Sequence, residues 1–118
     1  MNCVFCAIIA GQAPATIVRE WPDAIAIVPL RPVTPGHVLV IPRAHVADAF
    51  DDPIVTGAVF ARLAQLFREL GVPAANLITS IGEDASQTQF HLHGHGVPRW
   101  RGDGLQLPWT LQQTQHNA

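Results

Sequence analysis

Three histidines alternate with other residues near the C-terminal end of the chain, at His91, His93 and His95. In an extended strand, the side chains of residues i, i+2 and i+4 point to one face of the sheet. A helix would instead scatter them by about 200° per step of two residues. The pattern therefore predicts a strand over residues 90–97 that carries three imidazoles side by side.

Such a row of imidazoles indicates chemistry more than packing. Near neutral pH an imidazole can act as a base, an acid, a nucleophile or a metal ligand. Neighbouring imidazoles also lower one another's affinity for protons, which suits a nucleophile or a metal site. A strand that only chelates a metal remains the alternative at this point.

Length and composition indicate one small soluble domain. The chain has 118 residues, of which 48% are hydrophobic, so it has ample apolar side chains for one core. We find no apolar run of about 20 residues and no charged-then-apolar leader. We therefore expect a soluble, cytoplasmic protein without a membrane partner.

The charged residues exclude two further classes. The formal net charge is −2, which argues against a nucleic-acid partner bound through a basic surface. All seven basic residues are arginine, so the lysine-dependent phosphate-binding loop of P-loop proteins is absent. Phosphate chemistry in this chain would have to use histidine, arginine, hydroxyls and backbone N–H groups.

Cys3 and Cys6 are the only cysteines, and they form a Cys-x-x-Cys motif. In a cytosolic chain this motif indicates metal or redox chemistry. A thioredoxin-like site would need a preceding strand, which the position of the motif near residue 1 does not provide. The motif is also half of a zinc site, and His45 and His91 would complete two thiolates and two imidazoles. Free buried thiols are the remaining alternative.

Periodicity and turn chemistry predict an α+β domain with a mostly antiparallel sheet. A long helix should begin at Asp52-Pro53, where an N-cap acid precedes proline, and end before Gly71. The expected elements are a short helix over 4–10, strands over 16–20, 24–28 and 37–42, the long helix over 54–70, a strand over 75–81, a tight loop over 82–86 and the histidine strand over 90–97. The strand over 37–42 is a continuous apolar run, typical of a central strand buried on both faces.

Two stretches resemble a known family. His91-Leu-His-Gly-His-Gly-Val97, preceded by Gln87-Thr88, resembles the histidine triad motif of the histidine triad (HIT) family. Pro35-Gly-His-Val-Leu-Val-Ile-Pro42, followed by Arg43-Ala-His45, resembles the family's second signature. The resemblance runs from residue 3 to about residue 100, and the Cys-x-x-Cys motif is similar to that of a small bacterial branch. It implies a single HIT domain over 1–118 with about five strands, an irregular tail over 101–118 and a homodimer.

The resemblance also implies a reaction. His93 would be the nucleophile toward the α-phosphate of a purine nucleotide, with a nucleotidyl-histidine intermediate that water hydrolyses. His95 and His37 would flank the phosphate, while Gln87 and Thr88 would hold it and assist the leaving group. The substrate would be a nucleoside phosphoramidate, as for a phosphoramidase, or a dinucleoside polyphosphate. Members of the branch also carry histidine at the positions of His45 and His91, which supports a structural Zn²⁺ on Cys3, Cys6, His45 and His91.

The chain departs from the family pattern at several positions. Gly94 and Gly96 replace bulky apolar residues, so we expect unusual packing behind the histidines. Ser80 stands where many relatives have asparagine, and Pro29 where many have an acidic residue that contacts ribose. These two changes concern the contacts of the nucleotide's sugar and base. A nucleotide-binding protein with little turnover and a zinc-dependent regulatory module remain the alternatives to an enzyme.

Overall fold

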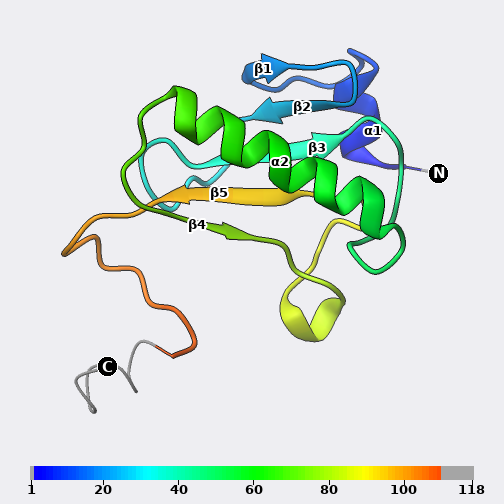
Figure 1. Ribbon diagram of the computed structural model, residues 1–118. Coiled ribbons are helices and arrows are strands. Elements are labelled where there is room, and N and C mark those ends of the chain that lie inside the picture. The colour runs from blue at the N-terminus through cyan, green and yellow to red at the C-terminus, as the bar shows by residue number, and fades with distance from the viewer. Residues whose placement is uncertain (1, 110–118) are drawn as a thin grey trace.

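A five-stranded antiparallel sheet with one long and one short helix forms the fold, which confirms the predicted α+β class (Figure 1). The computed structural model describes residues 2–109. In chain order the elements are α1 (Val4–Ile9), β1 (Ile17–Glu20), β2 (Ala24–Ile27), β3 (Val38–Pro42), α2 (Pro53–Glu69), β4 (Ala75–Ile78), the short 3-10 helix η1 (Glu83–Ala85) and β5 (Gly94–Pro98). The strands lie in the order β1-β2-β3-β5-β4, so β3 and β5 are central.

The two helices cover opposite faces of the sheet. Alternate residues of β2 and β3, such as Ala26 and Val40, pack against α2 in one core cluster. The intervening residues, such as Ile27 and Leu39, pack against Phe5 and Ile8 of α1 in a second cluster. Every residue of β2 and β3 is buried, as predicted for the continuous apolar run of β3.

α2 begins and ends where the sequence predicts. The side chain of Asp52 accepts hydrogen bonds from the backbone N–H groups of Ile54 and Val55, and Pro53 occupies the first helical turn. At the other end Gly71 adopts φ +70°, a left-handed conformation that glycine reaches without a Cβ clash. Both ends of the helix are therefore fixed locally.

Two glycines let α2 approach β5 closely. A Cβ placed on Gly94 would lie 2.8 Å from Leu63 Cδ1, and one on Gly96 would lie 2.7 Å from Phe67 Cζ. Leu63 and Phe67 are themselves buried in the core under α2. The glycines expected to alter the packing behind the histidines thus make room for large side chains of α2.

β5 begins later than predicted, at Gly94, because its neighbour β3 ends in a proline. The β3–β5 register pairs Val40 with Gly94, and continuing it would place Leu92 opposite Pro42. Proline has no N–H to donate to the ladder. The N–H of Leu92 donates instead to the carbonyl of Val46 at 2.8 Å. Residues 91–93 therefore run alongside β3 without belonging to the ladder.

The chain that follows β5 is held at its start by one arginine. Arg99 donates to both carboxylate oxygens of Asp103, to Asn76 Oδ1 and to the carbonyl of Leu105. Residues 99–109 contain no helix or strand, and residues 110–118 of the predicted irregular tail lie outside the described residues. Between residues 2 and 109, no helix combines the length and apolar character needed to cross a membrane.

Candidate functional site

The alternating histidines share the face of the sheet that α1 covers. Leu39, which packs against α1, pairs with His95 across β3 and β5. The rings of His93 and His95 lie 5.2 Å apart between centroids. Phe5 of α1 contacts the rings of both His91 and His93. The predicted row of imidazoles is therefore present, although only His95 lies within the strand ladder.

His37, directly before β3, orients His95. The backbone N–H of Val33 donates to His37 Nδ1 at 3.1 Å, so the proton of neutral His37 lies on Nε2. His37 Nε2 lies 3.0 Å from His95 Nδ1, and its proton is therefore donated to that atom. The proton of His95 is then on Nε2, where the described chain offers no partner. His95 thus presents one N–H donor to a ligand.

His93 presents a lone pair to a ligand, whereas His95 presents an N–H donor. Its Nδ1–H donates to the carbonyl of His91 at 2.9 Å, which leaves the lone pair on Nε2. On the other side, Thr79 Oγ1 donates to the carbonyl of His93 at 2.7 Å and fixes the backbone. The pair of His93 and His95 therefore offers a nucleophilic nitrogen next to a hydrogen-bond donor.

Burial keeps these imidazoles neutral. Desolvation lowers the pKa of His37 and that of His93 below their ordinary values. For His95, desolvation together with the neighbouring His93 and His37 lowers the pKa to about 4. At neutral pH all three rings are therefore uncharged, so His93 keeps its lone pair and His95 keeps the tautomer set by His37.

His95 should make the stability of the fold depend on pH. The unfolded chain binds a proton at His95 near pH 6.5, whereas the folded chain does so only near pH 4. Because the unfolded state binds more protons between these values, stability is expected to fall as the pH drops from about 6.5 to about 4. Thermal melting over this range should show a shallower decline for His95→Gln. Equal slopes in both proteins would contradict the lowered pKa.

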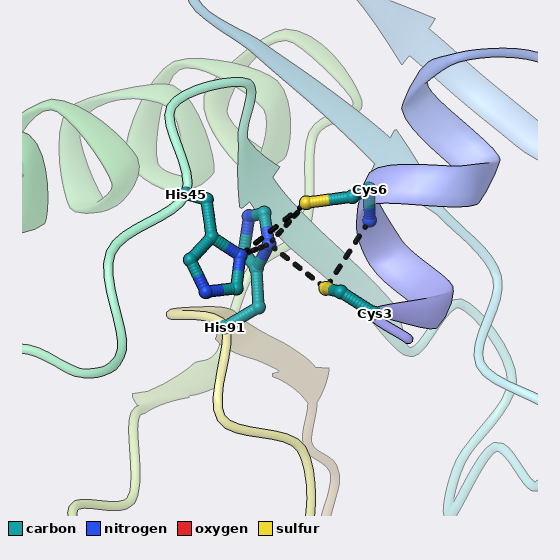
Figure 2. Close-up of side chains that lie close together, drawn as sticks. All are labelled: Cys3, Cys6, His45 and His91. Atoms are coloured by element: carbon teal, nitrogen blue, oxygen red, sulfur yellow. Dashed lines mark hydrogen bonds between the residues drawn. The ribbon is translucent and has the colours of Figure 1, made fainter. Parts of the chain in front are cut away.

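A second cluster lies at the N-terminal end of the histidine row and contains Cys3, Cys6, His45 and His91. Their ligand atoms all lie within 4.8 Å of one another. Figure 2 shows the two sulfurs from the start of α1 facing the two imidazoles from the opposite side. Cys3 Sγ lies 3.3 Å from His91 Nδ1, Cys6 Sγ lies 3.3 Å from His45 Nδ1, and the two Nδ1 atoms are 3.0 Å apart.

This arrangement fits a tetrahedral zinc ion. Zinc binds sulfur at about 2.3 Å and imidazole nitrogen at about 2.0 Å, which places tetrahedral ligand atoms roughly 3.3–3.8 Å apart. His91 is fully buried, and its Nε2–H donates to the carbonyl of Pro42 at 2.9 Å. Its Nδ1 lone pair therefore faces the cluster, as expected for a metal ligand held by an outer hydrogen bond. Four protein ligands leave no open position, so the site is structural.

The purified protein is expected to contain one zinc ion per chain. Cys3→Ser removes one thiolate and should lower the zinc content severalfold and the melting temperature by several degrees, because binding of the ion stabilises the folded state. Zinc can be quantified by atomic emission and melting followed by circular dichroism. His37→Asn, a change on the same face outside the cluster, should keep its zinc. Full zinc content in Cys3→Ser would contradict the assignment.

A mostly apolar cavity of about 690 Å³ lies on the α1 face of the sheet. Its walls include Phe5 and Ile8 of α1, Ile27 of β2 and Leu39 of β3. Pro29, predicted at a nucleotide contact, also lines it. The volume lies within the range of about 300–1,000 Å³ typical of small-molecule sites. Phe5 both lines this cavity and contacts the ring of His93.

The other predicted site residues make no hydrogen bond to the histidines in the described part of the chain. Gln87 is buried, and its amide bonds to the backbone of Gly82, Ala47 and Gln89, so it holds the loop in place. Thr88 is exposed and Ser80 half-buried. Among the described residues, neither of these two bonds to a histidine.

Sequence reasoning missed three contributors. Phe5 contacts His91 and His93, Thr79 contacts His93, and the backbone N–H of Val33 contacts His37. The position of Phe5 between the two cysteines was the one available signal. A threonine hydroxyl and a loop N–H have no pattern that distinguishes them in the sequence.

Comparison with known proteins gives consistent matches. The family model described as "HIT domain" matches residues 10–102. An uncharacterized HIT-like protein of Mycobacterium tuberculosis is 40% identical over 114 residues, covering 91% of this chain and 78% of that protein. An adenylylsulfatase of Arabidopsis thaliana is 31% identical over 117 residues, covering 95% of this chain and 59% of that protein.

A solved structure extends the match to the fold. The crystal structure of a zinc-bound histidine triad family protein from Mycobacterium smegmatis superimposes with a TM-score of 0.81 and 42% identity. The match covers 91% of this chain and 81% of that one. That neighbour is described as zinc-bound, in agreement with the cluster of Cys3, Cys6, His45 and His91.

Proposed function

The chain belongs to the HIT domain family, and from that premise we propose that it is a nucleotide hydrolase or transferase. It would cleave at the α-phosphate of a nucleoside phosphoramidate or a dinucleoside polyphosphate. The observation that carries the proposal is the hydrogen bond from His93 Nδ1 to the carbonyl of His91, which leaves the lone pair of Nε2 free to act as a nucleophile.

In the first step, His93 Nε2 attacks the α-phosphorus of the nucleotide. A phosphorus–nitrogen bond to His93 forms as the bond from phosphorus to the leaving group breaks. The leaving group of a phosphoramidate departs as an amine and takes up one proton. We assign this proton to the exposed Thr88 hydroxyl, which solvent reprotonates. The carbonyl of His91 accepts a hydrogen bond from Nδ1 and stabilises the positive charge that the ring acquires.

In the second step, water attacks the nucleotidyl-histidine. The new phosphorus–oxygen bond forms as the bond to His93 Nε2 breaks, which restores the lone pair and releases a nucleoside monophosphate and a proton. His95 Nε2–H is the proposed donor to a non-bridging oxygen during both steps. Both nitrogens of His37 are engaged, by Val33 and His95, so we assign His37 the positioning of His95 in place of a direct phosphate contact.

The cavity supports a nucleotide as the substrate. Its walls are mostly apolar, as suits the flat faces of a purine base, and Phe5 in the wall contacts the ring of His93. One matched relative is named an adenylylsulfatase, an enzyme acting on an adenylyl compound. We therefore propose an adenine nucleotide as the first substrate to test.

We further propose a homodimer that works in the cytoplasm. β4 is an edge strand of the sheet, and its Leu77 and Ile78 are exposed. The outer side of α2 presents Ala61 and Ala64, both exposed and small enough for close helix contact. A second copy could cover both surfaces at once. Cys3 and Cys6 form no disulfide, which suits a reducing compartment.

Rapid mixing with adenosine 5′-phosphoramidate, followed by intact-protein mass spectrometry, tests the proposal. We expect an AMP-sized adduct that appears before free AMP accumulates and that maps to the peptide containing His93. Hydrolysis without any adduct on this peptide would exclude the nucleotidyl-histidine route. Binding of AMP without adduct or turnover would instead identify the chain as a nucleotide-binding protein.

A further inference from the structure

We propose that Phe5 is a positioning residue that couples the metal cluster to the nucleotide site. Metal binding would hold the Phe5 ring against His93, so that zinc and nucleotide strengthen each other's binding. The inference rests on the proposed function, because it takes the cavity beside His93 as the nucleotide site.

Phe5 contacts both sites at once. It lies between Cys3 and Cys6 in the sequence, and its side chain is buried. Its ring meets His91, a cluster residue, edge-on with centroids 5.8 Å apart. It meets His93, the proposed nucleophile, in the same manner at 5.0 Å. The ring also forms part of the cavity wall.

The position of Phe5 depends on the cluster because α1 is very short. The helix has six residues, fewer than an isolated helix needs for stability in water. Its N-cap is Cys3, whose sulfur accepts the N–H of Cys6 at 3.3 Å. The same sulfur is a cluster ligand, so one atom begins the helix and holds the metal. Loss of the metal should therefore loosen α1 and, with it, the Phe5 ring.

The cluster is also connected to His93 through the backbone of His91. The His91 side chain belongs to the cluster, and the His91 carbonyl accepts the proton of His93 Nδ1. His93 therefore contacts two groups, the Phe5 ring and the His91 carbonyl. Phe5 lies between the cluster residues Cys3 and Cys6 in the sequence, and His91 is itself a cluster residue. Zinc binding would fix both groups and thereby favour the arrangement that binds nucleotide, as coupling requires.

Thermodynamic linkage makes the proposal measurable through the affinity for zinc as well as through the affinity for AMP. If zinc raises the affinity for AMP by some factor, AMP must raise the affinity for zinc by the same factor. We expect a factor of about 10, within the range common for coupled sites. Zinc affinity is measured on the full chain by competition with a chromophoric chelator, with and without saturating AMP. Calorimetric titration of AMP into zinc-loaded and chelated protein gives the reciprocal value.

Variants at two positions of α1 identify Phe5 as the link. Phe5→Ala should reduce the coupling factor to less than about 2, and Phe5→Leu, which fills space without a ring edge, should also reduce it. Phe5→Tyr restores the ring and should restore the coupling. Val4→Ala trims the same cavity from the same helix, so it should lower the affinity for AMP equally with and without zinc and leave the coupling factor at about 10. A full coupling factor in Phe5→Ala, or an AMP-independent zinc affinity in the wild type, overturns the proposal.

A measurement without nucleotide separates this proposal from the proposed function. Two-dimensional NMR of the zinc-loaded protein should show contacts between the ring protons of Phe5 and His93, and these should disappear on chelation. If AMP binds neither form of the protein, the proposed function fails. In that case, ring contacts that persist after chelation also overturn the positioning of Phe5 by the metal, and their disappearance supports it.

Discussion

Replacing His93 with alanine is expected to slow hydrolysis of adenosine 5′-phosphoramidate by about 10⁴-fold, because removal of a covalent nucleophile leaves only binding and charge stabilisation. The AMP adduct should disappear from the same variant. Steady-state kinetics and intact-protein mass spectrometry on one preparation measure both effects. Since His93 is half-buried and bonded only through Nδ1, the variant should still fold.

Two comparisons make this result interpretable. His93→Ala should retain its zinc and still bind AMP, which shows that chemistry alone has been lost. His95→Ala should show a smaller loss, of about 10²–10³-fold, as expected for removal of one donor to a developing charge. Undiminished hydrolysis by His93→Ala would refute the assignment of the nucleophile.

The second large effect concerns the glycines behind the histidines. Gly96→Ala is expected to destabilise the fold by about 1–3 kcal/mol, because the new methyl group would overlap Phe67 and Leu63 in a closed core. Gly57→Ala makes the same chemical change on α2, where nothing lies within 4 Å of the new methyl group. It should stabilise the fold by about 0.5–1 kcal/mol through helix propensity. Urea denaturation monitored by tryptophan fluorescence measures both.

A double variant tests the cause of the Gly96 effect. Phe67→Leu shortens the side chain that the new methyl group would meet, so Gly96→Ala should cost less in this background than in the wild type. The difference between the two backgrounds is the interaction free energy of a double-mutant cycle. Equal costs in both backgrounds would show that the destabilisation arises elsewhere.

Local signals in the sequence were enough for most of the fold. The cap at Asp52, the period of α2, the apolar run of β3 and the alternation of the histidines each depend on residues close together in the chain. The elements they predict are found within a few residues of the expected bounds. The cluster of Cys3, Cys6, His45 and His91 was also predicted, because two thiolates need two further ligands and the resemblance to the HIT family pointed to His45 and His91.

The remaining features depend on hydrogen bonds between distant residues. The sequence shows that His37 and Gln87 are polar and near the site, yet only the fold reveals that Val33, His95 and the loop backbone already engage them. The early end of the β3–β5 ladder also depends on residues that are distant in the sequence. Its cause, Pro42, lies about fifty residues before the strand that it shortens.

That proline has a consequence for how such a site can arise. A regular sheet uses nearly all of its backbone polar groups for pairing, which leaves few to act on side chains. Pro42 at the end of β3 ends the β3–β5 ladder, so residues 91–93 before β5 are left unpaired. The carbonyl of Pro42 then accepts a hydrogen bond from His91. The reactive tautomer of His93 is held by backbone in this unpaired stretch. A proline in β3 thus frees the backbone groups that fix the tautomer of His93 before β5.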